Sequence, residues 1–157
     1  AETAALMARE GAFLVPTLVT YFKIEELGRA LGFPAVSQRK VKDVLDAGLA
    51  SLAIAKAAGV SIGFGTDLLG ETHEHQSQEF SIRARVLSSA EILRSATLVN
   101  AALLRREGEL GVVAAGALAD LLVVDGDPLA DVTLLAEPEK HLLAVMKGGE
   151  FAVDRLG

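Results

Sequence analysis

The pattern of apolar and polar residues predicts helices that alternate with short strands in the first part of the chain. Strong helix formers fill residues 2–10, and Gly11 is suited to end that helix. The near-continuous apolar run at residues 12–19 is typical of a strand buried on both faces. Because Pro16 cannot donate a ladder hydrogen bond, we expect the regular strand to end near Val15 and residues 17–21 to form a loop.

The sequence then repeats the order of helix followed by strand. An amphipathic helix is predicted from about Ser37 to Ala58, and a short strand at residues 60–64 comes after Gly59. The order of helix, strand, helix, strand and helix indicates parallel βα units. Beyond a polar loop at residues 68–77, helices are expected around residues 80–87 and after the capping-box sequence Ser88-Ser89-Ala90-Glu91.

The pattern changes after Gly108, where short apolar runs are separated by turns. The segments 142–147 and 150–153 flank Gly148-Gly149, a two-residue spacing that favours a β-hairpin. We therefore predict two parts: a βα portion at residues 1–108 and a small β portion at residues 109–157.

The most informative local sequence is Gly63-Phe64-Gly65-Thr66-Asp67, at the end of the second predicted strand. Bulky and small residues alternate along this strand, so an extended backbone would leave its small-residue face open for a ligand. If the extended geometry continues through Thr66, Asp67 falls on that face at the C-terminal end of the strand, where α/β enzymes place working groups. Aspartate is also common in turns, so spacing alone leaves a turn and an active site as equal alternatives.

Composition narrows the classes of function. Hydrophobic residues make up 51% of the 157 residues, which suits a buried aliphatic core, and the net charge of −6 disfavours nucleic acid and anionic membranes as partners. The chain has no cysteine, so a metal would need histidine and carboxylate ligands. No signal-peptide pattern and no apolar stretch near the ~20 residues of a membrane span is present, and we expect a cytoplasmic protein.

Other polar residues near the predicted strand ends are weaker candidates. His73 and His75 have a spacing that resembles metal ligands, but they lie in a polar loop, so solvated residues and substrate contacts are both open. Tyr21 is the only tyrosine, and its hydroxyl could bind a substrate carbonyl or carboxylate or simply lie at a rim. Arg83 and Arg85 do not share a helix face, and we expect both to be exposed to solvent.

Four blocks of sequence together resemble the amidohydrolase superfamily, and within it the imidazolonepropionase-like and metal-dependent prolidase-like branch. They are Phe13-Leu14-Val15-Pro16-Thr17-Leu18, Gly63-Phe64-Gly65-Thr66-Asp67, the stretch from Ala96 to Ala102 that contains Thr97 and Asn100, and the stretch from Gly111 to Leu129. The resemblance implies an α/β fold that is the C-terminal part of a (β/α)8 TIM-type barrel. Residues 13–17 would be its seventh strand and residues 60–65 its eighth, and the segment after about residue 108 would belong to a small β-sandwich.

The resemblance also implies an activity, the metal-dependent hydrolysis of C–N bonds in dipeptides or N-acyl amino acids. Asp67 would bind a divalent ion, expected to be zinc in a binuclear site, and would take a proton from the attacking water. Tyr21 would contact the substrate carbonyl or its terminal carboxylate, and His73 and His75 would line the entrance. The other ligands of the family are an early His-x-His, a carboxylated lysine or glutamate, and two further histidines, and none matches a residue of this chain.

A whole (β/α)8 barrel takes about 250 residues, and this chain would supply only two of its strands. We therefore expect the C-terminal portion of a larger hydrolase, inactive by itself, whose open strand edges need a missing N-terminal barrel half or an oligomer partner. The alternative is a non-catalytic α/β scaffold or interaction fragment that lacks the metal-binding half.

Overall fold

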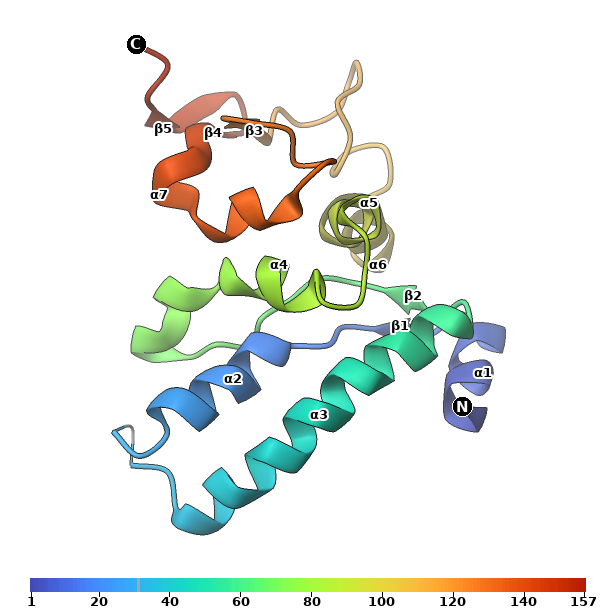
Figure 1. Ribbon diagram of the computed structural model, residues 1–157. Coiled ribbons are helices and arrows are strands. Elements are labelled where there is room, and N and C mark those ends of the chain that lie inside the picture. Colours follow the sequence, from blue (N-terminus) through green and yellow to red (C-terminus); the bar gives the residue numbers. More distant parts are fainter. Residues whose placement is uncertain (31) are drawn as a thin grey trace.

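Two small sheets are joined by helices in the computed structural model (Figure 1). It describes residues 1–30 and 32–157, and at positions 37–39 and 42 it describes the backbone alone. The first elements are α1 (Glu2–Arg9), β1 (Phe13–Leu14), α2 (Leu18–Leu27), α3 (Ala35–Ala57) and β2 (Ser61–Ile62).

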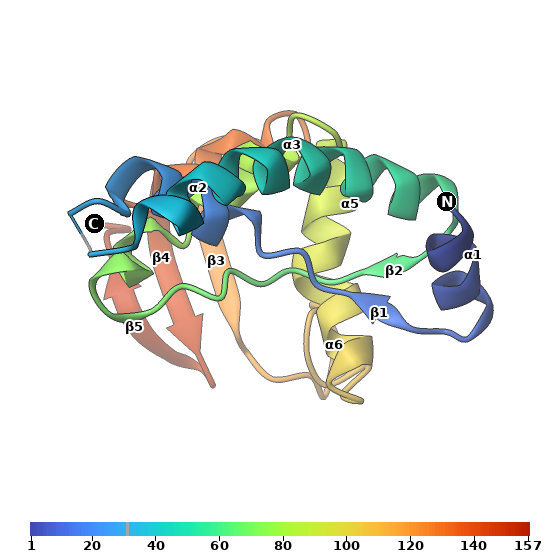
Figure 2. The same cartoon turned by 90° about the horizontal axis from the view of Figure 1, so that it is seen from below.

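The strands β1 and β2 pair in parallel, which confirms the predicted βα units. Phe13 is opposite Ser61 and Leu14 is opposite Ile62. Figure 2 shows the two strands side by side, with the segments that follow them running toward α2 and toward the helical turns after β2.

The predicted loop at residues 17–21 is wrong, because α2 begins at Leu18. Pro16 ends the strand as expected, but a carboxylate oxygen of Glu79 accepts the Val19 N–H at 2.7 Å. This contact satisfies a donor in the first turn of the helix, where no backbone partner exists. The long-range partner lets a helix start directly after the strand.

The middle of the chain is helical and leads to the second sheet. It contains the 3₁₀ turn η1 (Gly70–His75), α4 (Gln78–Arg83), α5 (Ser89–Arg94), the π-helical segment η2 (Ser95–Val99) and α6 (Asn100–Leu103). The predicted capping box is confirmed, since Glu91 accepts the Ser88 N–H at 2.8 Å and donates its own N–H to the Ser88 hydroxyl at 3.4 Å.

Glu91 gives the chain a pH-dependent contribution to stability. A hydrogen bond from Lys56, followed by the bonds from Ser88, lowers the pKa of Glu91 from 4.5 to about 2. A lowered pKa stabilises the folded state above pH 4.5, and this contribution disappears as the pH falls through about 2.

The substitution Glu91→Gln keeps the capping hydrogen bonds and removes only the charge. Because the side chain is 37% exposed, we expect the free energy of unfolding at pH 7 to fall by less than about 1 kcal/mol. In urea titrations the difference from the wild type should vanish between pH 4.5 and 2. A difference that stays constant across this range would contradict the assignment, and Glu10→Gln is the control at an exposed site.

The last elements are β3 (Leu121–Val124), η3 (Val132–Ala136), α7 (Pro138–His141), β4 (Leu142–Lys147) and β5 (Glu150–Asp154). The three strands form an antiparallel sheet in the order β3-β4-β5. The predicted hairpin is confirmed: Gly148 and Gly149 join β4 to β5 with φ values of 58° and 88°, which glycine adopts without a steric cost.

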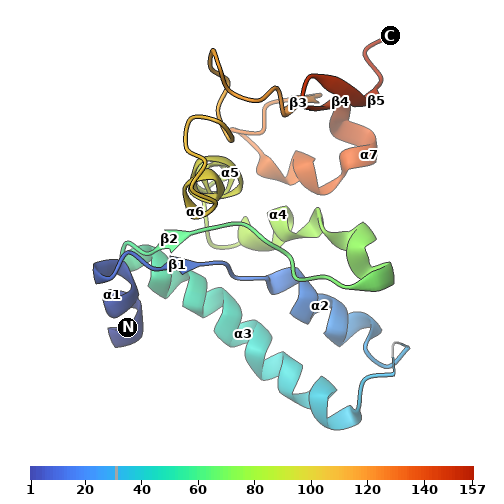
Figure 3. The same ribbon diagram turned by 180° about the vertical axis from the view of Figure 1, so that it is seen from behind.

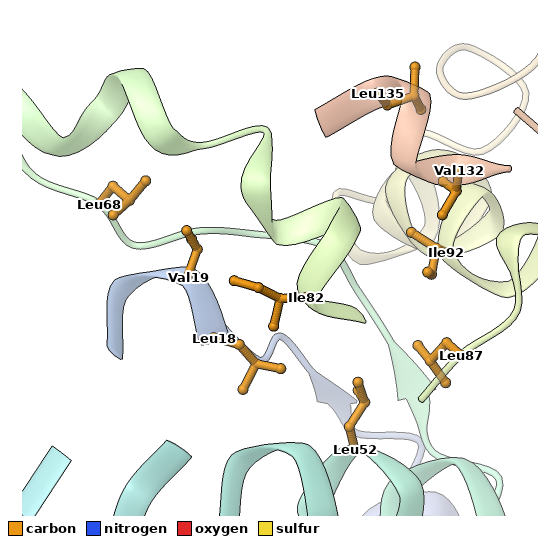
Figure 4. Close-up of a cluster of buried hydrophobic side chains, with 9 residues drawn as sticks. All are labelled: Leu18, Val19, Leu52, Leu68, Ile82, Leu87, Ile92, Val132 and Leu135. Carbon is orange, nitrogen blue, oxygen red and sulfur yellow. The ribbon is translucent and has the colours of Figure 1, made fainter. Parts of the chain in front are cut away.

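One hydrophobic core connects the two parts of the chain. Figures 1 and 3 show α4, α5 and α6 between the layer of α2 and α3 and the layer of η3, α7 and the second sheet. The core side chains of Figure 4 are Leu18, Val19, Leu52, Leu68, Ile82, Leu87, Ile92, Val132 and Leu135. The last two come from beyond residue 108, so the β portion packs directly on the helices that follow β2. None of the described helices combines the length and apolar character needed to cross a membrane.

Candidate active site

The C-terminal ends of β1 and β2 are bridged by a buried guanidinium. Leu14 accepts the Gly63 N–H at 2.9 Å, and in this register the next ladder bond would run from the nitrogen of residue 16 to the Gly63 carbonyl. Pro16 has no N–H to give. Arg83 donates to the Gly63 carbonyl at 2.7 Å and to the Pro16 carbonyl at 2.6 Å. It therefore replaces the bond that proline cannot make.

Arg83 is held by Glu79, one helical turn earlier in α4. The Arg83 Nε donates to Glu79 Oε1 at 2.6 Å, and both side chains are 0% exposed. Burial raises the pKa of the Glu79 carboxyl, although Arg83 and the backbone N–H of Val19 oppose the shift. For Arg83, burial acts in the other direction and lowers the pKa of the guanidinium, although Glu79 opposes this shift.

The expectation that Arg83 is exposed is wrong. Arg85 is exposed as predicted, and its guanidinium lies 4.9 Å from the centre of the Phe22 ring. Two signals in the sequence could have revealed the buried pair: Glu79 and Arg83 are four residues apart on one helix, and Pro16 leaves a carbonyl without its ladder donor.

Two more side chains fix the backbone of β2 and its continuation. Ser95 donates to the Ile62 carbonyl at 2.7 Å. Asn100 accepts the Phe64 N–H and donates to the Phe64 carbonyl, both at 2.9 Å. These residues come from the π segment and the start of α6, so the helices after β2 hold the strand that precedes Asp67.

The small-residue face of this segment does not leave room for a ligand, contrary to the prediction. A Cβ atom on Gly63 would lie 2.9 Å from Asn100 Oδ1, and one on Gly65 would lie 2.8 Å from Val15 Cγ1. Because these two glycines have no side chain, Asn100 and Val15 can pack directly against the backbone. The space that an isolated strand would offer is filled by Val15, which follows β1, and by α6.

Asp67 follows at a sharp change of direction. Its φ of 53° is in the left-handed region, so the extended geometry does not continue through this residue. The preceding carbonyl of Thr66 accepts a hydrogen bond from the Thr20 hydroxyl at 2.6 Å. The Asp67 side chain is exposed, and no described group pairs with its carboxylate. Asp67 thus occupies a turn and presents a free carboxylate.

A cavity of about 530 Å³ lies beside Asp67, between α2 and the loop that enters η1. Thr20, Lys23 and Ile24 contribute the wall from α2, where Lys23 and Ile24 lie about one turn after Thr20 on the same face. Lys23 is 6% exposed, and its Nζ binds Glu26 at 2.6 Å. This ion pair lowers the pKa of Glu26.

The other candidate residues do not line this cavity. Tyr21 is on α2 and is 37% exposed, while Thr20 and Lys23 face the cavity. His73 contacts the Leu68 carbonyl through Nε2 at 2.5 Å. His75 lies 3.6 Å from Glu74 and 3.5 Å from Gln78. The structure therefore brings Thr20 and Lys23 to Asp67, and the substrate roles of Tyr21, His73 and His75 stay predictions.

Asp67 offers one carboxylate as a candidate metal ligand. In the residues that the structure describes, no group of three or more His, Cys, Asp or Glu side chains could hold an ion. A zinc ion takes about four ligands. The carboxylate of Asp67 could serve as one of them, but the described residues form no cluster that would complete such a set.

The comparison with protein families settles the affiliation. The sequence profile of the amidohydrolase family matches residues 1–151. The chain belongs to the amidohydrolase family. This confirms the resemblance seen in its sequence blocks, and the α/β architecture is that of part of an amidohydrolase fold.

Solved amidohydrolase structures match almost the whole chain. One amidohydrolase is 50% identical with a TM-score of 0.94 over 99% of this chain, which is 38% of its own chain. A prolidase in complex with N-methylphosphonate-L-proline is 47% identical with a TM-score of 0.92 and covers 98% of this chain and 38% of its own. A Xaa-Pro dipeptidase with bound methionine is 30% identical with a TM-score of 0.84, and the match covers 97% of this chain and 37% of the dipeptidase chain.

This amidohydrolase chain thus spans about 38% of the length of the first structures it matches. These neighbours support the prolidase-like branch of the family. No curated protein gave a significant match.

Proposed function

We propose that this chain is the C-terminal portion of a metal-dependent amidohydrolase that cleaves the amide bond of dipeptides, with N-acyl amino acids as related substrates. The observation that carries the proposal is the free carboxylate of Asp67 beside a cavity, in the segment that follows β2 of a chain of this family. Dipeptides that end in proline are the first candidates, because a prolidase and a Xaa-Pro dipeptidase are among the similar structures.

Asp67 would act as the general base. One carboxylate oxygen accepts a proton from the water that attacks the amide carbonyl, and the same oxygen returns the proton to the departing amine. A divalent ion bound beside it, proposed to be zinc, would supply the acidity that makes this water reactive near neutral pH. The exposed position of Asp67 leaves both oxygens accessible for these roles.

Metal removal tests the proposal. The complete gene product that carries this sequence, loaded with zinc, is assayed on Xaa-Pro dipeptides and N-acetyl amino acids. We expect hydrolysis that falls by orders of magnitude after dialysis against a chelator and returns when zinc is added, since the ion activates the water. Zinc-loaded protein that hydrolyses none of these substrates would refute the proposal, and a dipeptide without proline tests the preference.

A non-catalytic scaffold is the second candidate. It is favoured by one observation, that the described residues contain no cluster of three metal-ligating side chains. A gene product that binds no zinc and has no activity, yet folds cooperatively, would support it. The open edges of β1 and β2 would then be expected to pair with a partner chain.

A further inference from the structure

We propose that Thr20 is a positioning residue, which holds the peptide before Asp67 and thereby aims the Asp67 carboxylate. This inference rests on the proposed role of Asp67. The Thr20 hydroxyl donates to the Thr66 carbonyl at 2.6 Å, across a sequence separation of 46 residues. His73 contacts the Leu68 carbonyl on the other side of Asp67, whereas Thr20 holds the peptide unit that carries the Asp67 nitrogen.

The backbone at Asp67 needs such a contact. A φ of 53° is unfavourable for a residue with a side chain, and conformations of this kind persist only where their surroundings fix them. The Thr66 carbonyl belongs to the peptide unit that carries the Asp67 nitrogen. Holding this carbonyl fixes one side of the Asp67 φ rotation.

Thr20 is the last of four side-chain donors along this segment. Ser95 holds the Ile62 carbonyl, Arg83 holds that of Gly63, Asn100 holds that of Phe64, and Thr20 holds that of Thr66. The segment that leads to Asp67 is therefore anchored almost residue by residue. The first three donors come from the helices after β2, and only Thr20 comes from α2.

The donor is itself held in place. The residue before it, Val19, is 0% exposed and donates its N–H to the buried Glu79. Glu79 in turn binds Arg83, which bridges the ends of both strands. A continuous chain of contacts thus runs from the strand ends through the first turn of α2 to the residue that precedes Asp67.

The chemistry of the hydroxyl separates positioning from substrate binding. Thr20 also lines the cavity, but a hydroxyl has a single proton. Since that proton is given to the Thr66 carbonyl, Thr20 cannot also donate it to a substrate. Loss of the Thr20 hydroxyl should therefore change the turnover of a bound substrate more than the binding of that substrate.

The test replaces Thr20 with Val, which has nearly the same shape and no donor, in the complete gene product. We expect kcat to fall about 10- to 100-fold, the size of effect that small misplacements of catalytic groups produce, with KM changed less than about twofold. Thr20→Ser should restore most of the lost turnover. Thr97→Val is the matched control, because Thr97 also donates to a carbonyl at 2.6 Å, that of Leu93, away from Asp67.

A second measurement does not depend on activity or on metal. In metal-free protein, hydrogen exchange of the amides at residues 65–69 should be faster in Thr20→Val than in the wild type and in Thr97→Val. Unchanged exchange together with unchanged kcat would overturn the inference, as would a rise in KM alone. If Asp67→Asn keeps its turnover, the proposed function fails, and the exchange data still decide whether Thr20 holds this segment.

Discussion

Replacing Arg83 with Met is expected to lower the free energy of unfolding by about 3–5 kcal/mol, the usual effect of breaking a buried ion pair. The variant leaves the Glu79 carboxylate without its counter-ion in a site that is 0% exposed. It also removes the donors of the Gly63 and Pro16 carbonyls. Pro16 has no N–H that could donate to the Gly63 carbonyl in place of Arg83. The ends of β1 and β2 therefore lose the guanidinium that bridges them.

Urea unfolding of three variants in the complete gene product separates these causes. Arg85→Met is the matched control, since Arg85 is exposed and stacks on Phe22, and it should cost less than about 1 kcal/mol. The double variant Glu79→Leu/Arg83→Met leaves no charge buried at this site and should be more stable than Arg83→Met. It should stay less stable than the wild type, because the two carbonyls and the Val19 N–H keep no partner.

Two outcomes would contradict this account of the guanidinium. The first is a loss for Arg83→Met that equals the small loss for Arg85→Met. The second is full recovery in the double variant, which would mean that only the charge pair matters and that bridging the strand ends contributes nothing.

Signals that act within a few residues were readable in the sequence. The parallel strands, the capping box of Ser88 and Glu91, and the hairpin at Gly148-Gly149 all follow from local spacing, and the structure has each of them. The family affiliation was also readable, because its blocks are short motifs in a fixed order. In the capping box and the hairpin, a residue and its main partner are close in the chain. The parallel strands pair residues far apart, and they were predicted from the repeated order of helix and strand.

The expectations that failed depend on distant partners. The start of α2 relies on Glu79, 60 residues away from Val19, and Arg83 reaches the Pro16 carbonyl 67 residues away. The glycine face of β2 looked open because the strand was considered alone, whereas Val15 and Asn100 fill it. For the site, the sequence indicated Asp67 but not Thr20, since a single hydroxyl in a helix has no pattern.

Replacing Asp67 with Asn in the zinc-loaded gene product is expected to reduce kcat by about 100- to 10,000-fold, the range for loss of a general base. The amide cannot accept the proton of the attacking water, and it is a poorer metal ligand than a carboxylate. The fold should be retained. The side chain is exposed, and asparagine tolerates a φ of 53° better than most residues, so the backbone turn needs no rearrangement.

Turnover, zinc content and the urea midpoint are measured together, because the combination separates the two roles of Asp67. Zinc content that falls along with turnover identifies Asp67 as a ligand, whereas normal zinc content with lost turnover identifies it as the base alone. Asp46→Asn, an exposed acid on α3, is the control and should leave all three values unchanged. Near-normal turnover in Asp67→Asn would remove Asp67 from the mechanism, and a large shift of the urea midpoint would show that the carboxylate stabilises the turn.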